Sequence, residues 1–266
     1  MSDAKKPRTT EVHARLWGAR ARDWADYQEG QVRAMYETVL ARSGLKPGMA
    51  YLDAGCGSGL AAQIAVSRGA RVSGIDAAGE LLAIARERSP KGDFRAGDLE
   101  ELPYADKSFD IVTGFNSFQF AGNPALALGE ARRVTKPGGI VAIVTWGKPE
   151  GMEMASIITS LKELMPPPPP GSPGPFALSD ETALRAFAVS GGLKPGEVFD
   201  IPCILDYPDL ATALRGLNSS GVAARAMENS SEQAVSAAHT KALAPFRQKD
   251  GHYKTKAMFR CLLARP

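Results

Sequence analysis

Short apolar runs alternate with segments of helical periodicity from Lys46 to Trp146, and this alternation restricts the chain to few folds. Four of the runs have the length and composition of buried strands (AYLDAG, ARVSGID, SFDIVTGFN and IVAIVTW), and a fifth is shorter (GDFRAGD). Most neighbouring runs are separated by helical patterns (LAAQIAVSR, ELLAIARER and PALALGEARRV). Because parallel strands need a crossover long enough to hold a helix, this order is typical of βαβ units. The sequence therefore predicts an α/β fold built on a parallel sheet.

The pattern changes after Gly147, where two further strands are expected (GEVFDIPCIL and HYKTKAMFRCLLA). We expect them to pair antiparallel and to complete a Rossmann-like, doubly wound, mostly parallel seven-stranded sheet with an antiparallel last strand. The segment between them, Asp206 to Pro245, is helical in composition and too long for a simple connection, so it is predicted to be an inserted cap. Pro166 to Pro170 predicts a stiff polyproline spacer. We expect a single domain over residues 1–266, with a core at about 37–205 and 251–266 and a helical cap at about 10–36 and 206–246.

Charge and cysteine content narrow the class of protein. The 266 residues carry 32 basic and 29 acidic side chains, and this net charge of +3 is too small for a nucleic-acid footprint. The basic residues Lys5, Lys6 and Arg8 lie in a polar stretch typical of a disordered terminus. The chain has three widely spaced cysteines without metal-type spacing, which fits the reducing cytosol. It has no apolar run near the roughly 20 residues that a membrane span needs. We expect a cytoplasmic protein with a small-molecule substrate, no nucleic-acid partner, no bound metal and no membrane insertion; the sequence specifies no oligomeric state.

Three glycines follow the first strand, in the order DAGCGSG. Gly55, Gly57 and Gly59 permit a tight turn and a close approach of the backbone to a ligand, and the helix N-terminus that follows is expected to present free amides. A dinucleotide-binding turn would read G-x-G-x-x-G, whereas the third glycine comes one residue early here. Asp53 stands directly before the turn, where a carboxylate repels a pyrophosphate but attracts the ammonium group of an amino-acid-bearing cofactor. The turn therefore favours S-adenosylmethionine over NAD.

Two further carboxylates end the next two predicted strands. Asp76 is placed to accept hydrogen bonds from both hydroxyls of a ribose. Asp98 could accept from an adenine amino group while the backbone amide of Leu99 reads the ring edge, although an isolated Asp at a strand end is more often a turn former. Open α/β sheets bind ligands at the carboxyl ends of their strands, and Asp53, Asp76 and Asp98 occur at such ends in succession. The order predicts one nucleotide-type site.

Four segments resemble the successive motifs of class I S-adenosylmethionine-dependent methyltransferases (YLDAGCGSG, GIDAAGELLAIAR, GDLEELPYADKSFDIVTGFNSFQF and ALGEARRVTKPGGIVAIVTWG). The resemblance is strongest to the small-molecule branch of the ubiquinone and menaquinone biosynthesis methyltransferases, and it covers roughly Tyr36 to Gly147. It implies S-adenosyl-L-methionine as the cofactor and a set of contacts to it: Asp53, Gly55, Cys56, Gly57, Asp76, Ala77, Asp98, Leu99, Phe115 and Asn116. Leu81 could flank the adenine, or lie in the core as an ordinary helix residue.

Methyl transfer from a sulfonium is an in-line displacement, so positioning of the nucleophile can carry most of the rate. A base is needed only for a nucleophile that arrives protonated and weakly acidic, and the sequence offers no clear one. His13, His239 and His252 lie outside the motifs and are expected at the solvated surface. Tyr27 and Trp146 are the catalytic candidates that we name.

Aromatic residues mark the predicted acceptor pocket. Trp17, Trp24 and Tyr27 are spaced to share one face of an N-terminal helix that resembles the family's active-site cover, and ordinary packing explains this face equally well. Aromatic residues also follow the fourth and fifth strands, where they could face the sulfonium or stack an apolar substrate (Phe118, Phe120 and Trp146). The substrate is expected to enter between the N-terminal helices and the inserted cap.

The leading interpretation is a methyltransferase that moves the methyl group to O, N or C of a small, apolar or aromatic metabolite. A second is a protein that binds the cofactor without methyl transfer, either as a regulatory module or as a cyclase. An NAD-dependent reductase is a third, and the glycine spacing and Asp53 disfavour it.

Overall fold

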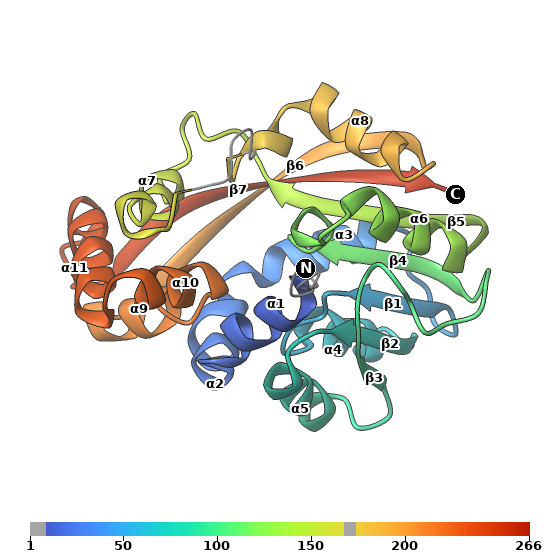
Figure 1. Ribbon diagram of the computed structural model, residues 1–266, viewed down its shortest axis with the longest axis horizontal. Coiled ribbons are helices and arrows are strands. Elements are labelled where there is room, and N and C mark those ends of the chain that lie inside the picture. Colours follow the sequence, from blue (N-terminus) through green and yellow to red (C-terminus); the bar gives the residue numbers. More distant parts are fainter. Residues whose placement is uncertain (1–8, 168–173) are drawn as a thin grey trace, which may run out of the picture.

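A seven-stranded sheet with the order β3-β2-β1-β4-β5-β7-β6 forms the centre of the computed structural model (Figure 1). The structure describes residues 9–167 and 174–266, so Lys5, Lys6, Arg8 and the second half of the polyproline run lie outside the described residues. The strands are β1 (Ala50–Ala54), β2 (Arg71–Asp76), β3 (Asp93–Ala96), β4 (Phe109–Phe115), β5 (Thr135–Trp146), β6 (Lys194–Tyr207) and β7 (Tyr253–Arg265).

All neighbouring strands from β3 to β5 pair in parallel, and β7 pairs antiparallel with both β5 and β6. The predicted mostly parallel sheet with an antiparallel last strand is confirmed. β1 lies between β2 and β4, and this is the point where the direction of the strand order reverses. Asp53 of β1 pairs with Gly74 of β2 and with Thr113 of β4. The carboxyl ends of these three strands therefore meet where open α/β sheets bind their ligands.

Helices cover both faces of the sheet and bury two separate apolar clusters. One cluster lies under α3, α4 and the inner face of α5, and the other lies under α6 and α8. The helices are α1 (Thr9–Gly18), α2 (Ala21–Asp23), α3 (Arg33–Arg42), α4 (Leu60–Ser67), α5 (Gly79–Arg88), α6 (Pro124–Val134), α7 (Met154–Thr159), α8 (Glu181–Ser190), α9 (Leu210–Leu217), α10 (Gly221–Asn229) and α11 (Glu232–Leu243). No helix within residues 9–167 and 174–266 is long and apolar enough to cross a bilayer.

An inserted helical cap (α9, α10 and α11) connects β6 to β7. The two strands pair from Lys194 to Tyr207, whereas only Phe259 to Ala264 of β7 pair with β5, so a two-stranded ribbon extends past the sheet and carries the cap (Figure 1). Because β6 runs through Tyr207, the inserted helices begin slightly later than the sequence predicts. The cap packs against the N-terminal helices: α10 contacts α1, and α9 contacts the segment around Trp24.

The N-terminal segment is not the continuous helix that the aromatic spacing predicts. α1 ends at Gly18, where a Cβ atom would meet the flexible carboxylate of Glu80 on α5, so a larger residue there would displace that side chain. A short α2, a π-helical turn (Trp24–Gln28) and a 3₁₀ turn (Glu29–Val32) follow before α3. Trp17 and Trp24 still contact each other, whereas Tyr27 faces the cap, so the expectation that all three share one helical face is wrong.

Candidate functional site

The glycine turn (Gly55–Gly59) leaves β1 at the centre of the sheet. Gly55 lies against Ser117, which follows β4, and a Cβ atom on Gly55 would collide with the Cβ of Ser117. Gly57 has a φ of +53° and a different environment. A Cβ atom there would meet only Glu29 Oε1 at 3.7 Å and Trp24 Nε1 at 3.8 Å. Gly57 therefore faces Glu29 and Trp24 of the N-terminal segment at ordinary van der Waals distance, with no side chain of its own between them.

Asp53 is a buried carboxyl without a cationic partner among the described residues. Its side chain is 1% exposed, and Thr113 Oγ1 donates a hydrogen bond to it at 3.1 Å. Burial, with a further contribution from the nearby carboxylates Glu29 and Asp76, raises the pKa of Asp53 to about 8. A ligand cation at this position would favour the ionised carboxylate, so the residue suits an ammonium or sulfonium group.

Asp76 holds the glycine turn against the end of β2. Its two carboxylate oxygens accept hydrogen bonds from the backbone amides of Gly57 at 2.8 Å and Ala78 at 2.9 Å. Burial raises the pKa of Asp76, and these amide donors oppose that rise. Each carboxylate oxygen can accept a second hydrogen bond, so the contact to a ribose stays a prediction.

Glu29 reaches the glycine turn from the N-terminal segment, and the sequence contains no local signal for it. Its side chain is 3% exposed and accepts hydrogen bonds from Ser58 Oγ at 2.6 Å and from the amide of Leu60 at 3.4 Å. It also forms an ion pair with Arg88 of α5. Burial raises the pKa of Glu29, and Arg88 opposes this. The first amide of α4 is thus bonded to a protein carboxylate, so the expectation that this helix N-terminus presents free amides to a ligand is wrong at that position.

α1 crosses the ends of β3 and β4. Thr10 Oγ1 donates to Asp98 Oδ2 at 2.5 Å, and the other Asp98 oxygen accepts from the amide of Glu100 at 2.9 Å. His13 Nε2 lies 3.0 Å from the carbonyl oxygen of Phe120. The predicted adenine-binding carboxylate is therefore covered by the N-terminal helix.

The histidine predictions have mixed outcomes. His239 lies inside the cap, where burial lowers its pKa to about 4 and its Nδ1 is 2.7 Å from Asn218 Oδ1. The expectation that His239 lies at the solvated surface is wrong, because its face of α11 packs into the cap. His252 is partly exposed and contacts Asp206.

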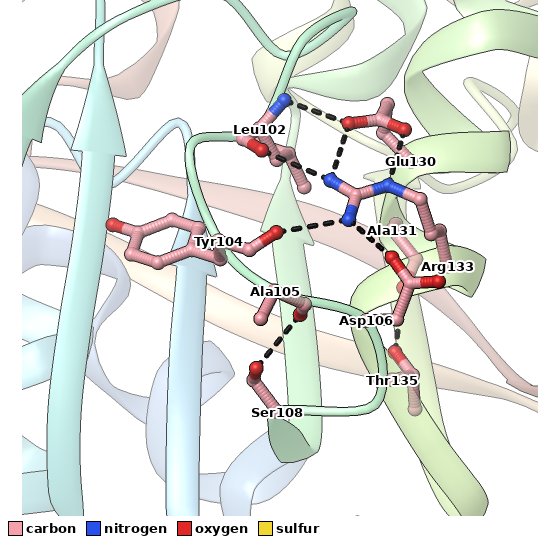
Figure 2. A network of polar contacts seen from close by, with 9 residues as sticks. All are labelled: Leu102, Tyr104, Ala105, Asp106, Ser108, Glu130, Ala131, Arg133 and Thr135. Atoms are coloured by element: carbon pink, nitrogen blue, oxygen red, sulfur yellow. Dashed lines mark hydrogen bonds and ion pairs between the residues drawn. The ribbon is translucent and has the colours of Figure 1, made fainter.

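The loop after β3, which begins with Asp98 and Leu99, is anchored by Arg133 of α6 (Figure 2). The guanidinium donates to the carbonyl oxygens of Leu102 and Tyr104, each at 2.9 Å, and to Asp106 at 2.7 Å. It also pairs with Glu130, whose carboxylate accepts from the amide of Leu102 at 2.8 Å. Figure 2 shows that the guanidinium fills the inside of the loop. Sequence reasoning missed this network because its members belong to a loop and a helix that are far apart along the chain.

The turn after β4 is strained and carries two amide side chains. Asn116 adopts a φ of +49°, a region that non-glycine residues rarely occupy. Its Oδ1 accepts from Gln119 Nε2 at 3.0 Å, whereas Gln119 Oε1 is buried without a partner in the described residues. Phe115, directly before the turn, packs edge-on against Tyr36 with the ring centroids 4.7 Å apart. Ser117 Oγ donates to the carbonyl of Ala54 at 2.6 Å, which seats this turn on β1.

The structure separates the aromatic residues of the predicted acceptor pocket. Tyr27 faces the cap, where its hydroxyl accepts from Arg215 at 2.7 Å. Trp146 stacks on Phe259 of β7 at 4.6 Å, on the β5–β7 side of the sheet.

The rings nearer the glycine turn also take different positions. Trp17 and Trp24 meet in a T-shaped contact at 4.9 Å and pack on the cluster of α5 that buries Leu81. Phe118 is 1% exposed and belongs to the core, whereas Phe120 is 42% exposed. Of these aromatic residues, the structure brings Trp24 next to Gly57.

The charges around the glycine turn fit S-adenosylmethionine and do not fit a dinucleotide. Asp53 and Glu29 are buried there, Asp76 is half-buried beside them, and Arg88 is the cation that pairs with Glu29. A pyrophosphate would meet this negative charge at short range, whereas an ammonium and a sulfonium would be attracted to it. The residues present therefore suit an amino-acid-bearing cofactor.

Comparison with known proteins agrees with this site. Residues 52–143 match a family model described as a methyltransferase domain. The chain is 31% identical over 210 residues to the malonyl-(acyl-carrier protein) O-methyltransferase of Erwinia pyrifoliae, which covers 78% of this chain and 75% of that protein. It is 36% identical over 120 residues to the demethylmenaquinone methyltransferase of Renibacterium salmoninarum, which covers 45% of this chain and 51% of that protein.

Several matches cover only part of the relative. The alignment spans about half of the length of the first curated relatives, 45% and 51%. Among solved structures, the 4+2 cyclase SpnF shares the fold at a TM-score of 0.60 and 22% identity, with 97% of both chains covered.

With the relatives and the site taken together, the chain belongs to the class I S-adenosylmethionine-dependent methyltransferases, in the small-molecule branch.

Proposed function

We propose that this protein catalyses the in-line transfer of the methyl group of S-adenosylmethionine to O, N or C of a small, apolar or aromatic metabolite. The observation that carries the proposal is Asp53, a buried carboxyl that has no cationic partner in the described residues and lies at the end of β1, just before the glycine turn. When bound, the cofactor supplies a methyl group on a positively charged sulfur. The two relatives named above act on malonyl-(acyl-carrier protein) and on demethylmenaquinone, as their names state.

The residues at the strand ends have separate roles in this proposal. Asp53 holds the ammonium group, Asp76 orients the ribose, and Asp98 and Leu99 read the adenine edge. Arg133 keeps the loop of Asp98 in place. Because the nucleophile must lie about 3–3.5 Å from the methyl carbon and in line with sulfur, the contribution of these residues is to hold the cofactor in one orientation.

The acceptor is proposed to enter between the N-terminal segment and the turn after β4. Phe115, which packs on the buried Tyr36, is half-buried there, and Gln119 Oε1 is a buried acceptor without a partner in the described residues. The N-terminal segment and the cap contact each other through Tyr27 and Arg215. No residue is assigned as a general base, because an acceptor that is already nucleophilic needs none.

Two measurements test the proposal. Calorimetry should detect binding of S-adenosylhomocysteine and none of NADH; binding of NADH alone would contradict the cofactor site. Isotope-labelled S-adenosylmethionine should then transfer its methyl group to a component of a small-molecule metabolite extract, with Asp53→Asn as the control that loses cofactor affinity. Binding without any labelled product would refute methyl transfer and favour a protein that uses the cofactor without donating its methyl group.

A further inference from the structure

We propose that Trp24 is a cofactor-binding residue, and that its indole N–H donates a hydrogen bond to the carboxylate at the amino-acid end of S-adenosylmethionine. The inference deepens the proposed function and rests on its cofactor site. It assigns Trp24 to the cofactor, whereas the sequence places this residue with the acceptor pocket.

The position of Trp24 is defined by the glycine turn. Within 4 Å of a Cβ atom built on Gly57, the structure contains only Trp24 Nε1 and Glu29 Oε1, at 3.8 and 3.7 Å. The nitrogen edge of the indole, and not its apolar ring, therefore faces the backbone that a ligand must approach. An indole nitrogen can only donate a hydrogen bond, so this edge presents a donor.

The amino-acid end of the cofactor needs such a donor near Asp53. Its ammonium and carboxylate groups are attached to one carbon, so a carboxylate lies close to any ammonium that Asp53 holds. In that place the carboxylate is repelled by the buried Asp53 and Glu29 and by the half-buried Asp76, which surround the turn. A hydrogen-bond donor beside Gly57 would offset this repulsion.

Several other donors of the turn already have protein acceptors. The amides of Gly55 and Cys56 donate to the carbonyl of Ile75, and the amide of Gly57 donates to Asp76. The hydroxyl of Ser58 and the amide of Leu60 donate to Glu29.

Trp24, by contrast, makes apolar contacts with Trp17 and with the cluster of α5. In the described residues its indole nitrogen, which lies next to Gly57, donates no hydrogen bond to a protein acceptor.

The fold holds Trp24 in place before any ligand arrives. Arg88 donates to the carbonyl of Ala25, the next residue along the chain, at 2.9 Å, and it pairs with Glu29 a few residues further on. The T-shaped contact with Trp17 fixes the other side of the ring. A donor held in this way loses little side-chain freedom on binding, which favours affinity.

Two ligands and two matched variants test the assignment by calorimetry. S-Adenosylhomocysteine carries the amino-acid end, whereas 5′-methylthioadenosine has the same adenosine and thioether without it. Trp24→Phe keeps an aromatic ring and removes the N–H. It should lower the affinity for S-adenosylhomocysteine about tenfold or more, whereas the affinity for 5′-methylthioadenosine should change less than about twofold. Trp17→Phe is the control, because the Trp17 nitrogen faces Gly221 of the cap and not the glycine turn; it should leave the ratio of the two affinities unchanged.

The ratio of affinities separates the contact from a loss of packing. The inference is overturned if Trp24→Phe lowers the affinities for both ligands equally, or if it leaves the affinity for S-adenosylhomocysteine unchanged. Trp24→His keeps a ring N–H and should recover part of the affinity for S-adenosylhomocysteine; a variant no better than Trp24→Phe also counts against it. If the wild-type protein binds no S-adenosylhomocysteine at all, the proposed function fails, and this outcome is distinct from the failure of Trp24 alone.

Discussion

Cofactor binding to this protein should release a proton at neutral pH, and Asp53 is the residue that should lose it. The carboxyl is 1% exposed, and in the described residues it has a single hydroxyl donor and no cation beside it. With a pKa of about 8, about nine-tenths of the molecules carry the proton at pH 7. The ammonium group of the cofactor interacts favourably with the ionised form, so binding must remove this proton.

The size of the effect follows from the difference between the pKa and the pH. At pH 7, which is about one pH unit below this pKa, ionising Asp53 costs about 1.4 kcal/mol. This cost lowers the affinity of the protein for S-adenosylhomocysteine about tenfold. The affinity for S-adenosylhomocysteine should therefore rise close to tenfold from pH 6 to pH 7, rise less from pH 7 to pH 8, and level off above pH 8. Close to one proton should leave the complex per ligand at pH 7.

Calorimetry in two buffers with different ionisation enthalpies measures the proton directly. The apparent binding enthalpy of S-adenosylhomocysteine should change with the buffer, whereas that of 5′-methylthioadenosine, which has no ammonium group, should not. Asp53→Asn should bind S-adenosylhomocysteine weakly and without the pH dependence. A wild-type affinity that stays flat from pH 6 to pH 8 with no proton released would refute the reasoning. An unchanged pH dependence in Asp53→Asn would assign the proton to another group and refute it as well.

The pKa of Asp53 also gives a stability prediction, because folding raises it above the unfolded value of 3.8. The contribution of this residue to the free energy of unfolding is fully present below pH 4 and is lost as the pH rises to about 8. Because S-adenosylhomocysteine should bind more tightly at the higher pH, it should raise the thermal unfolding temperature more at pH 8 than at pH 6. Gly59→Ala should lower stability by about 1–3 kcal/mol in urea unfolding, since a Cβ atom there would lie 2.7 Å from the Cβ of Ala85; an unchanged midpoint would contradict the packing. Arg88→Met should lower the free energy of unfolding by about 3–5 kcal/mol, because it leaves Glu29 buried and unpaired. The double variant with Glu29→Gln should recover part of this stability. A double variant less stable than Arg88→Met alone would argue against the ion pair. Trp146→Ala should impair turnover more than cofactor affinity, and equal losses in the two measurements would count against a role at the acceptor.

The sequence by itself determines the sheet and the positions of three carboxylates. Alternation of strand and helix patterns is a local property, and the order of the strands along the chain places Asp53, Asp76 and Asp98 at strand ends that share one edge. The same reasoning predicts the antiparallel last strand and the inserted cap, which the structure confirms. These features were predictable because they depend on periodicity and on chain order.

Only the tertiary structure decided what surrounds those carboxylates. Glu29 and Arg88 are far apart in the sequence and have no motif, yet they meet at the glycine turn because the N-terminal segment folds over it. The breaks after α1 send Trp24 toward Gly57 and Tyr27 toward the cap, although their spacing fits a single helical face. The physical reason is the same in each case: the burial and the charge of a side chain depend on long-range packing, and local sequence patterns do not record it.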